Sequence, residues 1–535
     1  MTIHPIAATT ACACARRAAL FANPIVYHLI VDRFCRDADL AGQACARSDA
    51  GFHGGSFNGI VARIEDGWFA RLGVNTLLIS SPVEQIAGWI PAPGGTQQYH
   101  AYHGYWPLDF TVVDRRLGTE SDFDALVAAA HAHGLNVVLD LVLGHVGYQD
   151  LQTLARYRPD CVAPGWQAAT PADYRSHLLA GDDAHGLWGE WIDAARASDQ
   201  TSRLPQLALE RRVAALPVHL QHKPGTRAVA KHDATVGDYL VDWAAHWVHA
   251  RGVDGFRCDS AAHVPLAMWQ RLKAAAAGAP QHAACQHGCD AAGRFWMTGE
   301  VYGHGIEVDA YFAHGFDSLL NFAFQPEIAQ LMALQEHGAE FGSEIYHRRI
   351  DKLYARYAAR IHATPHASML SYISSHDTVL FERRHLRRAM TALLLAPGGV
   401  LVLYGDECGR LPGDASPSDP AQATRSPLDW HALDLDLLRH CRALGQFRAR
   451  HACIAQGAHR RLGIHPYAFG RVLDGDATIV VLDAGAGATI DAGGVFAEGT
   501  ALLDAYTGAR TRVVGGRIAV DHGDIALLAR AGDLP

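Results

Sequence analysis

Three carboxylic acids each stand at the end of a short apolar run in this sequence. Asp259 ends VDGFRCD, Glu300 ends RFWMTGE, and Asp377 follows SYISSH. Two carboxyl groups can act as nucleophile and as general acid/base when their pKa values differ. A single acid after an apolar run is more often a helix cap. Three acids at successive run ends, two of them beside Arg257 or His376, favour a catalytic cluster.

Arg257 stands two residues before Asp259, and residues i and i+2 of a strand point to the same face. The guanidinium group would therefore lie beside the carboxylate and keep it ionised. Glu300 would be surrounded by like charge and shielded from water. Both effects raise the pKa of a carboxyl group toward that of a working acid. His145, which ends the run LNVVLDLVLGH, would join the cluster from another strand.

Alternating strands and helices must position these side chains. The helical stretch 121–134 begins with Ser121 and Asp124, a capping-box-like pair, and ends at Gly134 directly before the next apolar run. Short connections between doubly buried runs are typical of parallel βα units. Eight parallel strands favour a closed (β/α)8 TIM barrel, whose active site lies at the carboxyl ends of the strands. We predict strands at 25–31, 73–82, 135–145, 253–259, 294–300, 316–322, 369–375 and 399–405.

Two regions break this alternation. The stretch 146–235 is too long for a βα loop and lacks sustained periodicity, which predicts a domain inserted after the third strand. After about residue 455, short alternating runs separated by glycine turns predict an all-β C-terminal domain. The predicted domains are a barrel over 1–145 and 236–454, the insertion over 146–235, and a C-terminal β-sandwich over 455–535.

Composition and charge exclude several classes of function. The chain has 535 residues, of which 49% are hydrophobic, and a net charge of −9 without a basic run, so nucleic acid is not an expected partner. The longest apolar stretch, 392–405, is broken by Pro-Gly-Gly and is too short to cross a membrane. Nothing in the sequence specifies a protein partner.

Cysteine usage and the N-terminus bear on location and on metal binding. Eleven cysteines at scattered spacings predict no complete disulfide framework. The N-terminus does not read as a secretory signal, which predicts a cytoplasmic protein; a periplasmic location is the alternative if the true start differs. The pattern CQHGC at 285–289 is interpreted as incidental, so no metal-ligating residue is assigned.

Four ordered segments resemble the signature motifs of the α-amylase family of retaining α-glucan hydrolases. They are DLVLGH (140–145), GFRCDSAAH (255–263), MTGE (297–300) and YISSHD (372–377), with AYHGYW (101–106) before them and YGDE (404–407) after them. Within this family the chain looks closest to the bacterial periplasmic maltodextrin α-amylases, on segments such as FHGG (52–55) and SPVEQIAGW (81–89). The resemblance implies a barrel with an inserted domain B and a β-sandwich domain C.

The resemblance also implies a role for each candidate residue. Asp259 would be the nucleophile that attacks the anomeric carbon, Glu300 the acid and then the base, and Asp377 an acid that hydrogen-bonds sugar hydroxyls. Such a double displacement needs two carboxyl groups about 5 to 5.5 Å apart and retains the α configuration. Residues implied to contact the glucan are His103, Tyr105, Trp106, His145, Arg257, His263, His376, Asp419 and Arg425.

Individual contacts follow from the same resemblance. Tyr105 would stack on the glucose unit whose hydroxyls accept hydrogen bonds from His145 and His376. Asp419 and Arg425, in SDPAQATRS, resemble an acid and arginine pair that holds the next glucose on the non-reducing side.

Two of the departures from the family pattern bear on calcium and on sugar binding. Gly144 replaces an asparagine that often gives calcium an oxygen at the junction of barrel and domain B. Calcium needs six to eight oxygens, so a structural calcium stays open, whereas the chemistry needs no cofactor. Ala262 replaces a lysine common before His263, which predicts a weaker grip on the leaving-group side.

The sequence is compatible with three functions. The favoured one is hydrolysis of α-1,4-glucosidic bonds of maltooligosaccharides by double displacement. Transglycosylation or isomerisation on the same barrel is the alternative, because both share the glycosyl-enzyme intermediate. A non-catalytic glucan-binding protein is less favoured, because all three carboxylates are present.

Overall fold

The structure is a computed structural model that describes residues 13–40, 51–91, 97–166, 170–178, 186–193, 204–277, 295–336, 341–413, 421–485, 487–520 and 523–533. Asp419 and the CQHGC pattern at 285–289 lie outside the described residues. No helix in the described ranges combines the length and the apolar character that a bilayer crossing requires.

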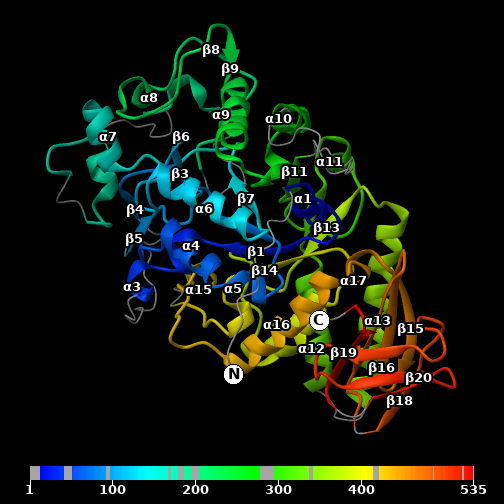
Figure 1. The fold of residues 1–535 in the computed structure, drawn as a ribbon. Coiled ribbons are helices and arrows are strands. Elements are labelled where there is room, and N and C mark those ends of the chain that lie inside the picture. The colour runs from blue at the N-terminus through cyan, green and yellow to red at the C-terminus, as the bar shows by residue number, and fades with distance from the viewer. Residues whose placement is uncertain are drawn as a thin grey trace.

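Eight parallel strands close into a barrel in the order β1-β14-β13-β12-β11-β10-β7-β2 (Figure 1). Each predicted run supplies one strand, so the predicted (β/α)8 barrel is confirmed. Every residue of these strands is buried except the first of β13, as expected for a parallel sheet that is filled inside and covered by helices outside. The strands are β1 (Ile25–Leu29), β2 (Thr76–Ile79), β7 (Asn136–Leu141), β10 (Gly255–Cys258), β11 (Trp296–Gly299), β12 (Ser318–Asn321), β13 (Ser368–Ser371) and β14 (Gly399–Leu403).

Helices surround this barrel and begin at defined caps. Helix α6 begins with a capping box of Thr119 and Asp122, so the predicted cap at Ser121 was placed two residues too late. The left-handed Gly134 follows its end, as predicted. The longer barrel helices are α4 (Phe57–Glu65), α6 (Glu120–Ala132), α9 (Val236–Arg251), α10 (Leu266–Ala277), α12 (Phe324–Glu336), α13 (Phe341–Ala363), α14 (Leu386–Leu394) and α16 (Leu435–Arg450).

A further helix, α1 (Ala13–Ala22), closes the amino-terminal end of the barrel. Leu20 is fully buried and packs with Val26, Leu78 and other residues of the barrel interior. Arg16 forms an ion pair with the buried Asp254, at an N–O distance of 3.1 Å. The amino-terminal end is therefore packed and ionically closed, which leaves the opposite end for a site.

Two small sheets and a long connection stand at that opposite end. After β2, strand β3 (Val83–Gln85) pairs with β6 (Pro107–Val113), and β4 (Trp89–Pro91) pairs with β5 (Gln98–His100). The connection from β7 to α9 contains α7 (Leu151–Tyr157), α8 (Val218–His222) and the pair β8 (Arg212–Val213) and β9 (Ala234–Thr235). Figure 1 shows α7 and α8 beside β3 and β6. The domain limits at 146 and 235 stay a prediction.

The C-terminal region is an antiparallel sheet with the strand order β15-β16-β17-β22-β19-β20-β21-β18. This confirms the predicted all-β C-terminal region; its limit at 455 stays a prediction. The sheet encloses a core of its own and packs against α13, on the side of the molecule away from α7 and α8 (Figure 1). Its strands are β15 (Ala458–Ile464), β16 (Tyr467–Leu473), β17 (Asp476–Leu482), β18 (Ala488–Asp491), β19 (Ala501–Asp504), β20 (Arg510–Val514), β21 (Arg517–Val520) and β22 (Ile525–Arg530).

Candidate active site

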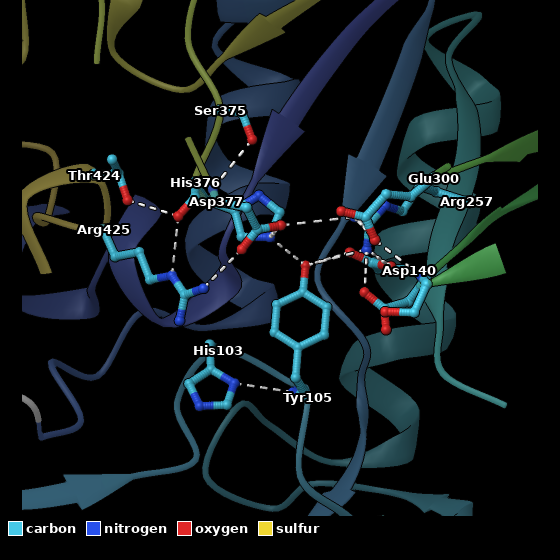
Figure 2. A network of polar contacts seen from close by, with 12 residues as sticks. His103, Tyr105, Asp140, Arg257, Glu300, Ser375, His376, Asp377, Thr424 and Arg425 are labelled. Atoms are coloured by element: carbon cyan, nitrogen blue, oxygen red, sulfur yellow. Dashed lines mark hydrogen bonds and ion pairs between the residues drawn. The ribbon is translucent and has the colours of Figure 1, made fainter. Parts of the chain in front are cut away.

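One buried arginine gathers four carboxylates at the carboxyl ends of the barrel strands (Figure 2). Nη1 of Arg257 lies 2.7 Å from Asp140 Oδ1 and 2.8 Å from Asp259 Oδ1. Nη2 lies 2.9 Å from Glu300 Oε2 and 3.8 Å from Asp377 Oδ2. Arg257 is only 1% exposed, so these charges compensate one another largely without water. The structure thus brings together the three acids and the arginine singled out in the sequence.

The backbone after β10 determines where Asp259 and Glu300 point. The amide of Asp259 donates to Leu141 O at 2.9 Å, and the amide of Glu300 donates to Cys258 O at 3.0 Å. Both acids therefore continue the barrel hydrogen bonding one residue beyond their strands. Ser260 then takes a left-handed conformation, with φ of +48°, and its amide donates to Glu300 Oε2 at 2.9 Å. A backbone strain of about 1 to 3 kcal/mol is thus accepted where it directs an amide at a carboxylate.

The electrostatics separate the carboxyl groups. Burial raises the pKa of Glu300 to about 7; Arg257 opposes the rise, and the charges of Asp259 and Asp377 add to it. Burial also raises the pKa of Asp259, against the attraction of Arg257. Burial alone would raise the pKa of Asp377 too, but His376, Arg425 and Arg257 together hold it well below its usual range. Near neutral pH, Glu300 is therefore the acid poised to carry a proton.

Tyr105 connects the cluster to two histidines. Its hydroxyl donates to Asp140 Oδ2 at 2.6 Å and lies 2.6 Å from His376 Nε2, while its ring stacks on His376 at 5.4 Å between centroids. Nε2 of His376 also lies 2.9 Å from Asp377 Oδ2, and Nε2 of His145 lies 3.1 Å from the carbonyl oxygen of Tyr105. Both histidines thus contact Tyr105, and His376 also contacts the third acid, as Figure 2 shows.

The remaining sugar-contact candidates lie around this group. His103 accepts the amide hydrogen of Tyr105 at Nδ1 (3.0 Å), and its ring packs edge to face on Trp106 at 4.7 Å. Burial lowers the pKa of His103 well below its usual range, and Arg425 lowers it further. His263 is half-buried in the short turn after Asp259.

Arg425 contacts the third acid and the residue before it, and its predicted role at the next glucose stays a prediction. Its Nη2 lies 2.9 Å from Asp377 Oδ1, and its Nε donates to the carbonyl oxygen of His376 at 3.3 Å. Thr424 donates to the same carbonyl oxygen at 2.6 Å. In this structure Arg425 therefore holds the third acid. Asp419, its predicted partner, lies outside the described residues.

Asp140 also belongs to the site, although it was not among the candidate site residues predicted from the sequence. It is 1% exposed, and burial raises its pKa against the attraction of Arg257. Arg257 and Asp140 are register partners on the adjacent strands β10 and β7. Strand adjacency is the signal that could have identified Asp140. The third and fourth barrel strands are neighbours, and Asp140 and Arg257 each lie near the start of the motif that its strand carries.

Gly144 itself offers calcium no side-chain ligand. Its carbonyl oxygen accepts the amide hydrogen of Leu207 at 2.9 Å. The side-chain atoms closest to where a Cβ would lie are Val264 Cγ2 at 3.4 Å and Gln206 Oε1 at 4.0 Å. Within the described ranges, no group of three His, Cys, Asp or Glu side chains is arranged to hold a metal. Calcium requires six to eight oxygen ligands.

Fold and site together describe a barrel enzyme with a carboxylate cluster, and comparisons with known proteins agree. The family described as "Alpha amylase, catalytic domain" matches residues 32–174. The periplasmic alpha-amylase of Escherichia coli (strain K12) is 33% identical over 505 residues, which cover 86% of this chain and 72% of that protein. The chain belongs to the alpha-amylase family of glycoside hydrolases, which needs no cofactor for its chemistry.

Two further matches have lower sequence identity. A cyclomaltodextrin glucanotransferase of Paenibacillus macerans is 25% identical over 76% of this chain, which spans about half (52%) of that enzyme. The crystal structure of an alpha-amylase from Geobacillus thermoleovorans complexed with acarbose superimposes with a TM-score of 0.63 at 20% identity, covering 96% of this chain and 99% of that one. This second similarity shows a shared fold.

The predicted cytoplasmic location is wrong. The E. coli relative, which is similar over most of the chain, is a periplasmic enzyme, and this similarity points to the periplasm instead.

Proposed function

We propose that this protein hydrolyses α-1,4-glucosidic bonds of maltooligosaccharides and retains the α configuration. The observation that carries the proposal is the placement of Asp259 and Glu300 on the two Nη atoms of one buried arginine. This arrangement holds two carboxyl groups close together, as a retaining double displacement requires. Relatives named as alpha-amylases, and neighbours solved with acarbose, maltose or maltotriose, support a glucan substrate.

In the first step, protonated Glu300 gives its proton to the glycosidic oxygen while Asp259 attacks the anomeric carbon. The bond to the leaving sugar breaks, and a covalent glycosyl-enzyme forms. A pKa of about 7 leaves about half of Glu300 protonated at neutral pH, whereas an ordinary glutamate would be almost fully ionised. Separate Nη atoms of Arg257 contact the two acids, so the contact with one does not exclude the contact with the other.

In the second step, Glu300 is a carboxylate and takes a proton from water. The water oxygen attacks the anomeric carbon from the face that the leaving sugar vacated, and Asp259 is released as a carboxylate. Asp377 keeps its negative charge throughout because His376 and Arg425 hold it ionised. Its charge can therefore stabilise the positive, oxocarbenium-like sugar in both transition states.

Aromatic and imidazole groups would orient the sugar. We propose that Tyr105 and Trp106 contact the apolar face of the glucose unit, and that His103, His145, His263 and His376 contact its hydroxyls. Burial lowers the pKa of His145 to about 4, so this residue is neutral at working pH and takes part in hydrogen bonds without adding charge. We propose that Arg425 positions Asp377. We also propose that Arg425 contacts the next glucose while it remains paired with Asp377.

A product time course with maltoheptaose tests the proposal. Hydrolysis predicts that reducing ends accumulate with each bond cleaved, and NMR of early products should show the new reducing ends in the α configuration. A constant number of reducing ends with altered chain lengths would instead support transglycosylation, the second candidate, which the glucanotransferase relatives favour.

A further inference from the structure

The small ladder of β3 and β6 places two acids directly opposite each other. Glu84 on β3 and Asp109 on β6 are register partners. Like charges at directly opposed positions of an antiparallel pair destabilise it. The Asp109 side chain is fully buried and that of Glu84 is mostly buried, so water screens the repulsion only weakly. The ladder therefore needs a cation.

Lys223 supplies that cation from the connection between β7 and α9. It directly follows α8, and its Nζ forms ion pairs with Glu84 Oε2 and with Asp109 Oδ2, the latter at 3.0 Å. The Lys223 side chain is only 6% exposed. A buried ammonium group is costly unless paired, so the lysine and the two acids depend on one another. Asp109 Oδ1 is itself held by the amide and hydroxyl of Thr111, at 2.9 and 2.6 Å.

This ladder leads straight into the proposed sugar-contact residues. Trp106 directly precedes β6, and its amide donates to Oε1 of Gln85, the neighbour of Glu84, at 2.6 Å. Tyr105 comes one residue earlier and must reach Asp140 with its hydroxyl. A displacement of either strand would therefore move Tyr105 and Trp106 relative to the carboxylates.

We propose that Lys223 is a positioning residue for the reaction: its ammonium group fixes the β3–β6 ladder and thereby the sugar-facing wall of Tyr105 and Trp106. The Lys223 ammonium group thus connects the long insertion to the β3–β6 ladder. Gly144, near the start of this insertion, offers calcium no side-chain ligand. Because the wall would bind sugar without touching the reacting bond, the loss should fall mainly on KM. The inference rests on the proposed hydrolysis of maltooligosaccharides.

The test compares Lys223→Met, Lys223→Arg and Glu84→Gln with the full-length wild type, using maltoheptaose. Lys352→Met, at an exposed lysine on α13, is the matched control. We expect kcat/KM of Lys223→Met to fall about 10- to 100-fold, mostly through KM, because small misplacements of positioning groups have effects of this size. Lys223→Arg keeps the charge and should stay within about threefold of wild type, and Lys352→Met should match wild type.

The outcomes separate this inference from the proposed function. If the wild type fails to cleave maltoheptaose, the proposed function fails first. If the wild type cleaves it and Lys223→Met has wild-type KM, the positioning role is refuted. A fall in kcat as large as the rise in KM, not restored by Lys223→Arg, would also refute it. Such a result would indicate a lysine with a merely structural role. If Lys223→Met does not fold, Glu84→Gln decides: a raised KM with unchanged kcat supports the inference, and an unchanged KM overturns it.

Discussion

Glu300→Gln gives the sharpest test of the proposed chemistry. It replaces a carboxyl group that can give and take a proton with an amide of nearly the same shape that cannot. Burial and neighbouring acids raise the pKa of Glu300 from 4.5 to about 7. A shift of that size is worth about 3 kcal/mol in favour of the protonated form. In wild type, kcat/KM should therefore decline above about pH 7, approaching tenfold per pH unit as the acid loses its proton.

The expected loss depends on the leaving group. A glucose leaving group needs protonation, so kcat/KM of Glu300→Gln for maltoheptaose should fall by about 10²- to 10⁴-fold. Fluoride leaves without a proton, so kcat/KM for α-maltosyl fluoride should fall far less. The second step still needs a base, so kcat on the fluoride should stay low until azide is added. Azide needs no deprotonation and should restore kcat while forming α-maltosyl azide.

Steady-state kinetics with both substrates, from pH 5 to 9 (about two units either side of the pKa), measure all of these effects. Tyr372, which is buried nearby, offers a matched control in Tyr372→Phe, because its hydroxyl takes no part in the proposed steps. Equal losses on maltoheptaose and on the fluoride would refute the acid role of Glu300. An alkaline limb that persists in Glu300→Gln would assign that limb to another group.

Further predictions concern the arginine, the leaving-group side and calcium. Arg257→Met leaves four carboxylates without their shared cation, so urea unfolding should show a loss of about 3 to 5 kcal/mol and turnover should vanish; an unchanged unfolding free energy would contradict the central role of Arg257. Ala262→Lys adds a donor at an exposed position, so KM for maltoheptaose should fall about 2- to 10-fold with unchanged stability, and an unchanged KM would place the leaving-group side elsewhere. Excess EDTA should leave turnover and Tm unchanged, and a loss that calcium restores would show that other residues hold the metal.

Much of the barrel could be predicted because its strands are short, apolar and buried on both faces. Some strands were predicted to extend too far, because burial continues beyond the last residue that pairs with a neighbouring strand. Val142 and Leu143, for example, are buried beyond the end of β7, so hydrophobicity alone could not locate that end. The predicted start of α6 was wrong because two pairs of residues have the spacing of a capping box. Thr119 with Asp122 and Ser121 with Asp124 are equally spaced, and only the extended backbone at Thr119 selects between them.

The site shows a similar division. Residues at strand ends could be predicted because a parallel barrel brings those ends together whatever their separation along the chain. Partners that depend on loop conformation could not: Arg425 reaches Asp377 across 48 positions, and no local pattern marks that contact. The same holds for Lys223, whose partners Glu84 and Asp109 are identified only when the insertion is seen against the β3–β6 ladder.

Hydrolysis and transfer share the first step, so the carboxylate cluster would form the glycosyl-enzyme intermediate equally well for both reactions. What differs is whether water or a sugar hydroxyl reaches the anomeric carbon while Glu300 is a carboxylate. A sugar must be held on the leaving-group side for that time, whereas water needs no such grip. The turn after Asp259 presents the short side chain of Ala262 to solvent, beside a half-buried His263. A weak hold there favours departure of the leaving sugar before a second one binds, and this is the physical reason to expect hydrolysis over transfer.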